Sequence, residues 1–316
     1  MAQLMKGHSW QDALKPVRGR PRFEYPIIVE VKADEIRCQV KYVQSWSGFA
    51  HIEYLSYSGK PLHNLASFDG AFIAYFRAMW PVITELDVGI EVNGNFNDSY
   101  RWTQSSSGIP QEKFDKKSGK TSPALDVSMV KFILFDLPEN KKPFVDRMID
   151  IDFAADGLRH YGLNCSRPER ALCNSDYAVM FHYNRFRNMG HEGAMGKTLD
   201  HLYERKRTYG WLKIKPKETL DGVITGINQA HTSVEGFGEN GLWVPKGTAL
   251  PRAGSVSVRF EDGSTADCGG LEHGQARDMF ENPAAYIGQW AECERMEEDR
   301  AGGSRHPIFK RLREAK

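Results

Sequence analysis

The sequence lacks any long apolar run. No stretch within its 316 residues approaches the roughly 20 apolar residues that a helix needs to span a bilayer. The first segment, MAQLMKGHSWQDALK, has no apolar core of the kind that marks a secretory signal peptide. Internal repeats and low-complexity segments are absent as well. We therefore expect a cytoplasmic protein with no membrane partner.

Cysteine is scarce, and the net charge is close to zero. The spacing of the five cysteines gives neither a disulfide framework nor a Cys-x-x-Cys zinc site. They are Cys38, Cys165, Cys173, Cys268 and Cys293. The formal net charge of +1 does not by itself indicate a nucleic-acid-binding protein. Two local segments, 15–22 and 305–316, are rich in basic residues and are candidates for phosphate contact.

The composition is that of a globular protein, with 41% hydrophobic and 26% charged residues, and the length suits about two domains. Residues 1–218 mix patterns typical of strands and helices. We expect strands within 26–33, 37–46, 48–59, 87–98, 129–138, 192–200 and 210–216. We expect helices within 65–86, 143–162 and 174–193, with Ser175 or Asn174 as a cap of the last one.

The pattern of the sequence changes near residues 216–220. From there to residue 316 the sequence predicts short strands separated by glycine-rich turns, within 221–229, 241–247, 255–265 and 287–298. One helical pattern, 270–283, interrupts them. Such a pattern is typical of a small β-barrel of the oligonucleotide-binding type, the OB-fold. The expected domains are therefore 1–218 and 219–316.

A lysine stands where the strand at 26–33 ends. Lys32 follows the apolar run PIIVEV and begins the charged segment KADEIR. By itself this segment is weak evidence, since a solvated strand end explains it as well. Later segments contain further candidate active-site residues, which follow Lys32 in this order: Glu91 in GIEVNG, Phe135 and Asp136 in KFILFDLP, Glu192 in HEGAMGK, and two lysines in WLKIKP. Those two, Lys213 and Lys215, alternate along a strand and therefore project from one face.

In this order and spacing the chain resembles the covalent nucleotidyltransferase superfamily, and most of all the small bacteriophage ATP-dependent DNA ligases. GHEGAMGK and GWLKIKPKETLDGVITG carry the resemblance most specifically. The final segment, RHPIFKRLREAK, is similar to the closing motif of those ligases. The resemblance implies an α+β protein, with a nucleotidyltransferase domain of antiparallel sheets and flanking helices followed by an OB-fold barrel.

The implied activity is the sealing of 5′-phosphate/3′-hydroxyl nicks in duplex DNA by a monomeric enzyme, in the host cytoplasm if its origin is a phage. Lys32 would attack the α-phosphate of ATP and carry AMP as a lysyl phosphoramidate. A lysine is mostly protonated near pH 7, so neighbouring cations and desolvation must favour its neutral form. Lys213, Lys215 and Mg²⁺ would supply that positive field and stabilise the transferring phosphoryl group.

The resemblance assigns roles to further residues. Glu192, Glu91 and Asp34 would serve Mg²⁺, a hard cation that prefers carboxylate oxygens, with the role of Glu91 left open between metal and ribose. Phe135 would stack on adenine, with Phe132 as the alternative. The remaining nucleotide-binding set has Glu30 on the adenine amino group, Arg37 on the ribose or the 5′-phosphate, and Lys197. In the barrel, the residues expected to act on the pyrophosphate leaving group are Arg305, Arg313 and Lys316.

The chain departs from the family pattern at several positions. Glu35 stands where the family has the glycine that permits a tight turn beside the nucleotide. Gly89 and Ile90 replace an Asp-Gly pair before Glu91, and Ala315 replaces an aspartate before Lys316. We expect the change Glu35→Gly to retain adenylylation of Lys32.

Other functions share part of this pattern. An RNA ligase uses the same lysine chemistry, and an mRNA-capping guanylyltransferase would take GTP. A non-catalytic nucleic-acid binder with a decayed site is the alternative from a different class. Binding alone needs no lysine nucleophile, and Lys32, Glu192, Lys213 and Lys215 are all present. DNA ligation is therefore the leading hypothesis.

Overall fold

The computed structural model describes residues 4–115, 120–215, 218–237, 242–298 and 304–313. The chain divides into two compact units, Met1–Lys215 and Pro216–Lys316. None of the helices in the described ranges has the length and the apolar character to cross a membrane.

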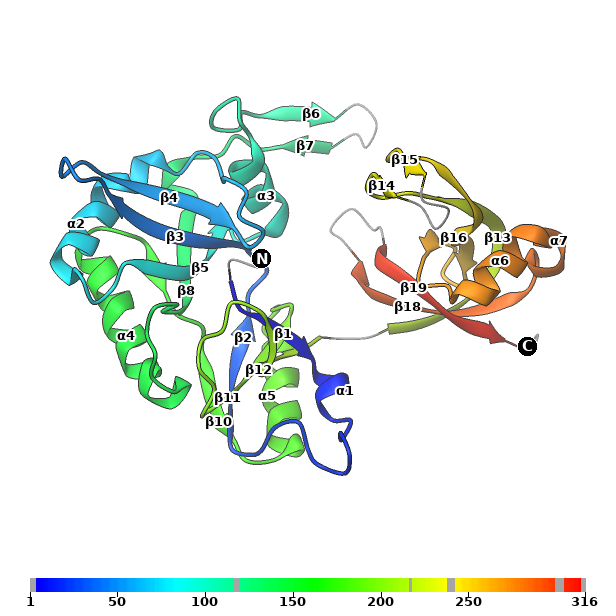
Figure 1. Cartoon of the computed structure of the whole chain (residues 1–316), viewed down its shortest axis with the longest axis horizontal. Helices are drawn as coiled ribbons and strands as arrows, with labels where there is room; N and C mark the ends of the chain where they lie inside the picture. The colour runs from blue at the N-terminus through cyan, green and yellow to red at the C-terminus, as the bar shows by residue number, and fades with distance from the viewer. Residues whose placement is uncertain (1–3, 116–119, 216–217, 238–241, 299–303, 314–316) are drawn as a thin grey trace. The chain divides into compact units, whose positions relative to one another are not determined.

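One five-stranded sheet of the N-terminal unit contains the strand that ends at Lys32. Its order is β1 (Lys6–Ser9), β12 (Arg207–Ile214), β11 (Gly193–Thr198), β2 (Ile27–Lys32) and β10 (Arg170–Cys173). Only β1 and β12 run parallel; the other neighbours are antiparallel. Helix α5 (Asp176–Asn188) packs against this sheet, and the short α1 (Trp10–Ala13) follows β1 (Figure 1). Because β2 lies between two neighbours, residues 27–31 are all buried.

A second five-stranded sheet has the order β4 (Ala50–Ser56), β3 (Ile36–Gln44), β5 (Glu85–Val92), β8 (Val130–Asp136) and β9 (Cys165–Ser166). The helices α2 (Asp69–Met79) and α4 (Phe144–His160) pack against it through the largest apolar core of the protein (Figure 1). The smaller elements are η1 (Ala66–Phe68), α3 (Phe96–Gln104), β6 (Lys113–Asp115), β7 (Lys120–Ser122) and η2 (Val127–Met129).

The C-terminal unit is a small barrel. Its antiparallel strands have the order β17 (Thr265–Cys268), β16 (Ala249–Phe260), β13 (Glu218–His231), β18 (Trp290–Glu298) and β19 (Ser304–Arg313). Hydrogen bonds from Gly269 N to Pro307 O and from Phe309 N to Gly269 O join the last strand to the end of β17. The sheet thereby closes on itself, as in an OB-fold. The other elements are β14 (Gly236–Phe237), β15 (Trp243–Val244), α6 (His273–Glu281) and α7 (Pro283–Tyr286).

Most predicted elements are confirmed, and two local signals explain their ends. The Ser175 side chain caps α5 by accepting a hydrogen bond from Ala178 N at 3.3 Å. Gly162, with φ +87°, follows α4 as a left-handed stop. The helix predicted over 65–86 was too long: α2 ends at Met79 because Pro81 cannot continue it, and the residues from Glu85 belong to β5. The strand predicted over 87–98 was also too long, since β5 ends at Val92 and α3 begins at Phe96. The elements that were not predicted are β1, α1, α3, β6, β7, η2, β9, β10, β14, β17, α7 and β19.

Candidate active site

The N-terminal unit contains a pocket of about 400 Å³ to which both sheets contribute. Among the described residues that line it, seven are cations and two are carboxylates. The cations are Lys6, Lys32, Arg37, Lys197, Arg207, Lys213 and Lys215, and the carboxylates are Glu30 and Glu35. Phe135, Tyr57 and Trp211 supply aromatic surface. The structure thus brings together seven of the residues that the sequence predicts for nucleotide binding and catalysis: Glu30, Lys32, Arg37, Phe135, Lys197, Lys213 and Lys215.

Lys32 is held by a carboxylate at the end of β2. Its ammonium donates to Glu192 Oε2, and Lys215 donates to the other oxygen of the same carboxylate. Gly193 pairs with Lys32 across the ladder, which places the residue before β11 beside the nucleophile. Burial acts to lower the pKa of Lys32, but the charges of Glu35, Glu192 and Asp34 outweigh burial and raise it. The expected lowering of the Lys32 pKa by cations is therefore not found in this structure.

Lys213 shows the lowered pKa instead. Burial, followed by the charges of Lys215, Arg207, Lys32 and Arg37, lowers the pKa of the Lys213 ammonium to about 8. Its position on β12 causes this, since the strand carries Lys213 into the same pocket as the other cations. Glu192 responds in the opposite direction: burial acts to raise its pKa, but Lys32 and Lys215 together keep it below the ordinary value.

Glu30 forms a buried ion pair with Lys197 across β2 and β11. The distance from Lys197 Nζ to Glu30 Oε2 is 2.7 Å, and the two side chains are 1% and 5% exposed, respectively. The ammonium also donates to Phe135 O at 3.0 Å and lies 4.5 Å from the centroid of the Trp211 ring. Burial raises the pKa of Glu30 against the lowering effect of Lys197. This pair explains how the otherwise apolar strand β2 tolerates a glutamate at its centre.

Arg37 is fixed by a carboxylate that sequence reasoning missed. Its Nε donates to Asp87 Oδ1 at 2.8 Å and its Nη2 donates to Oδ2. Tyr203 Oη donates to the same Oδ2 at 2.7 Å, so Asp87 is fully engaged. The guanidinium lies 4.6 Å from the Trp211 ring. Asp87 lies on β5, the neighbour of β3, and only this strand pairing relates it to Arg37.

The aromatic candidate is Phe135 and not Phe132. Phe135 lines the pocket, whereas Phe132 is buried in the core and makes edge contacts with Phe68 and Phe72 at 5.0 and 5.2 Å. The alternation of side chains along β8 puts these two phenylalanines, three residues apart, on opposite faces of the strand. The neighbouring Asp136 is buried and accepts two hydrogen bonds from Arg147, at 2.8 and 3.0 Å.

Two of the departures from the ligase pattern are in contact. A Cβ atom added at Gly89 would lie 2.3 Å from Glu35 Cγ and 2.9 Å from the Phe135 ring. The Glu35 side chain therefore occupies the space that a side chain at position 89 would need. Its Oε2 atom is buried and has no hydrogen-bond partner among the described residues. Burial, with the charge of Glu192, raises the pKa of this carboxyl.

The three predicted metal ligands are not gathered into one cluster. Within the described ranges, no group of three or more His, Cys, Asp or Glu side chains is placed to hold a metal ion. Glu91 lies on β5, with its carboxylate 4.0 Å from Lys131 Nζ, while Glu192 faces Lys32 and Lys215. Asp34 acts electrostatically on Lys32. Mg²⁺ usually takes one or two carboxylates together with phosphate oxygens and water, so Glu192 fits a metal bound with nucleotide.

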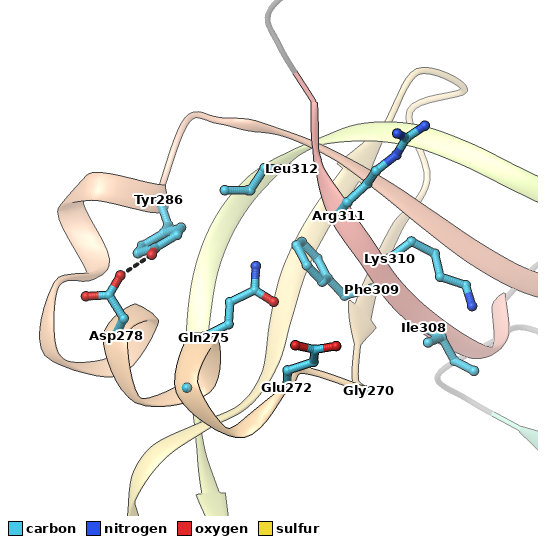
Figure 2. Close-up of a pocket in the computed structure, with 11 residues that line it drawn as sticks. Gly270, Glu272, Gln275, Asp278, Tyr286, Ile308, Phe309, Lys310, Arg311 and Leu312 are labelled. Atoms are coloured by element: carbon cyan, nitrogen blue, oxygen red, sulfur yellow. Dashed lines mark hydrogen bonds between the residues drawn. The ribbon is translucent and has the colours of Figure 1, made fainter.

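The predicted residues of the C-terminal unit are on or beyond β19. Arg313 is paired with Asp221 at 3.2 Å and with Glu292 at 2.9 Å, and Arg311 shares Glu292. Arg305 belongs to β19, but its side chain is outside what the structure describes, and Lys316 lies outside the described residues altogether. A cavity of about 840 Å³ lies between α6, α7 and β19. Figure 2 shows Lys310 and Arg311 on one side of it and the hydrogen-bonded Tyr286 and Asp278 on the other.

The comparisons with known proteins agree with the predicted resemblance. No family model matches the chain. A DNA ligase of Enterobacteria phage T3 is 29% identical over 136 residues, which cover 42% of this chain and 36% of that enzyme. The matched stretch is thus little more than a third of the length of that curated relative.

Solved structures cover far more of the chain. Pmar-Lig_PreS3 has a TM-score of 0.70 at 20% identity over 98% of this chain and 67% of its own. The ATP-dependent DNA ligase from bacteriophage T7, solved in complex with ATP, has a TM-score of 0.53 at 18% identity over 98% of each chain. The chain is similar to the ATP-dependent DNA ligases. The predicted fold class, an α+β domain of antiparallel sheets with flanking helices followed by an OB-fold barrel, is confirmed.

Proposed function

We propose that the protein is an ATP-dependent DNA ligase that seals nicks in duplex DNA through AMP bound covalently to Lys32. The observation that carries the proposal is the position of Lys32 at the end of β2, in a pocket that also contains Phe135, Lys213 and Lys215. The similarity to the phage T3 and T7 ligases supports it. Nothing in the pocket favours the RNA ligase or the guanylyltransferase alternative.

In the first step, Lys32 Nζ would attack the α-phosphorus of ATP. The N–P bond forms, the bond from that phosphorus to the β-phosphate oxygen breaks, and pyrophosphate leaves. Lys213 and Lys215 would neutralise charge on the transferring phosphoryl group. The Lys32 ammonium must lose a proton first, so the Glu192 carboxylate that stabilises it has to change partner. Mg²⁺ held by Glu192 and the nucleotide phosphates would supply the compensating positive charge.

The next two steps use the same pocket. A 5′-phosphate oxygen of the nick would attack the phosphorus of lysyl-AMP and release the Lys32 amine, which gives DNA-adenylate. The 3′-hydroxyl would then attack the 5′-phosphorus, and AMP would leave. Phe135 would hold adenine, since its ring lines the pocket near Glu30 and Lys197. Because Lys197 already occupies one oxygen of Glu30, a contact to the adenine amino group would use the other.

Several finer assignments belong to this proposal. These are the domain limits 1–218 and 219–316, the metal roles of Glu91 and Asp34, and the pyrophosphate roles of Arg305, Arg313 and Lys316. Arg37 would contact the ribose or the 5′-phosphate from its fixed position beside Asp87. We expect a monomer that acts on nicked duplex DNA in the cytoplasm, which would be that of the host cell if the protein is of phage origin.

Intact mass spectrometry tests the proposal directly. The purified protein, first freed of any bound AMP with pyrophosphate, is incubated with Mg²⁺ and ATP, GTP or NAD. A gain of one AMP with ATP, absent in Lys32→Ala, is the expected result. Nicked DNA and nicked RNA substrates then separate the two ligase classes. A gain of one GMP would move the protein to the capping enzymes, and no adduct with any nucleotide would refute the proposal.

A further inference from the structure

Three cations of the pocket have no carboxylate partner among the residues that the structure describes. Four of its seven cations have an acidic partner: Lys32 and Lys215 share Glu192, Arg37 has Asp87, and Lys197 has Glu30. In the part of the chain that the structure describes, no ion pair engages the other three. These are Lys6, Arg207 and Lys213. Three positive charges in one concave surface are unfavourable for the folded protein unless a ligand compensates them.

The strand β1 creates this arrangement. Lys6 N donates to Lys206 O at 2.9 Å, and Lys6 and Arg207 are register partners across β1 and β12. Like charges directly opposite each other on neighbouring strands are normally destabilising. Gly7 follows, so close to β12 that an added Cβ would lie 2.6 Å from Trp211 O. A glycine at position 7 therefore lets β1 approach the pocket and carry the Lys6 side chain to its edge.

The Lys6 ammonium lies over an aromatic ring at the pocket. Its Nζ is 4.0 Å from the centroid of Tyr57, which also lines the pocket. Such a contact holds a cation in place without neutralising its charge. Burial lowers the pKa of Lys6, and the charges of Arg207 and Arg37 lower it further. The ammonium is thus positioned but electrostatically strained, which is the condition that a bound anion relieves.

We propose that Lys6 and Arg207 form, with Lys213, a phosphoryl-binding subsite in which Lys6 is a direct ligand. This inference rests on the proposed function and extends it. A group with several negative charges and several acceptor oxygens suits three cations of mixed Lys and Arg type. Two phosphoryl sources share that chemistry: the β- and γ-phosphates of the nucleotide, and the 5′-phosphate of the nick.

Direct binding tests the subsite without depending on catalysis. The probes are inorganic tripolyphosphate and two nicked duplexes that differ only in a 5′-phosphate or 5′-hydroxyl at the nick. Lys6→Gln removes the charge, Lys6→Arg keeps it, and Lys41→Gln removes an exposed cation of β3 that does not line the pocket. Thermal unfolding of each variant without probe checks that it is folded.

We expect Lys6→Gln to bind a phosphoryl probe about tenfold more weakly, the loss expected for one charged hydrogen bond. Lys6→Arg should restore most of the affinity, and Lys41→Gln should leave it unchanged. Weaker binding of tripolyphosphate assigns the subsite to the nucleotide tail. A loss confined to the 5′-phosphorylated nick assigns it to DNA. Wild-type affinity of Lys6→Gln for all probes would overturn the subsite, whereas failure of AMP transfer to Lys32 would affect only the ligase assignment.

Discussion

Removing the buried carboxylate of Glu30 should destabilise the N-terminal unit strongly. In Glu30→Gln, the Lys197 ammonium keeps its charge at 1% exposure but loses the negative charge that neutralises it at 2.7 Å. Breaking one side of a buried ion pair costs about 3–5 kcal/mol, because the remaining charge stays desolvated. For a unit of this size we expect the melting temperature of the full chain to fall by roughly 6–20 °C.

A double-mutant cycle isolates the interaction. Lys197→Met alone and Glu30→Gln with Lys197→Met complete the cycle, measured by thermal unfolding and by urea titration. The double variant has no unpaired buried charge, so it should be more stable than Glu30→Gln alone, with a coupling of about 1–3 kcal/mol. Methionine keeps much of the lysine volume beside the Phe144 and Trp211 rings.

A second ion pair serves as the matched control. Glu169 and Arg185 are also 2.7 Å apart, but their side chains are 44% and 46% exposed. Glu169→Gln should therefore change stability by no more than about 1 kcal/mol. If Glu30→Gln costs as little as this control, or if the two changes in the cycle are additive, then Lys197 is not a desolvated charge and the reasoning fails.

Three further outcomes follow from the site. Lys213→Met should abolish adenylylation yet raise the melting temperature at pH 7, because the pKa of Lys213 is about 8 in the folded protein and 10.5 in the unfolded chain. This gain in stability should be complete below pH 8 and should disappear as the pH approaches 10.5. A gain that does not change with pH would contradict the reasoning. Gly89→Ala should lower the free energy of unfolding by about 1–3 kcal/mol, because the added methyl group meets the Glu35 side chain. Adding Glu35→Gly to the same chain should restore part of that stability, which urea titration measures. Burial lowers the pKa of His201 to about 4, and its neutral ring accepts a hydrogen bond from Trp211 Nε1. The free energy of unfolding should therefore fall as the pH drops from 6.5 to 4. His201→Gln should make the free energy of unfolding depend less on pH in this range.

The sequence predicted which residues line the pocket better than it predicted which residues form ion pairs with them. The position of Lys32 at a strand end and the common face of Lys213 and Lys215 follow from local patterning, and the structure places all three at one pocket. The partner of Arg37 could not be found in this way. Asp87 lies 50 positions away in the chain, and only the pairing of β3 with β5 brings the two together. Contacts of this kind depend on topology, which composition and periodicity leave open.

The departures from the family pattern also involve a contact between distant residues that the sequence alone could not predict. In the sequence, Glu35 and Gly89 are two separate substitutions, 54 positions apart, and each by itself raises doubt about the site. In the structure the larger residue fills the space above the smaller one. The pair therefore conserves volume beside Phe135, as paired core substitutions do. The expectation that Glu35→Gly retains adenylylation stays a prediction, with a cavity beside Phe135 as its physical cost.

The distribution of ion pairs indicates an order of events in the pocket. Lys32, Lys215, Arg37 and Lys197 each have a carboxylate partner, so a phosphate that approaches any of them must compete with that partner. A phosphate that approaches Lys6, Arg207 or Lys213 displaces no carboxylate from the described part of the pocket. Electrostatic capture should therefore begin at these three cations, and the exchange of Glu192 away from Lys32 should follow. Lys32 and Lys215 identify the nucleotidyl-transfer chemistry in the sequence, and their ion pairs with Glu192 must open before that chemistry occurs.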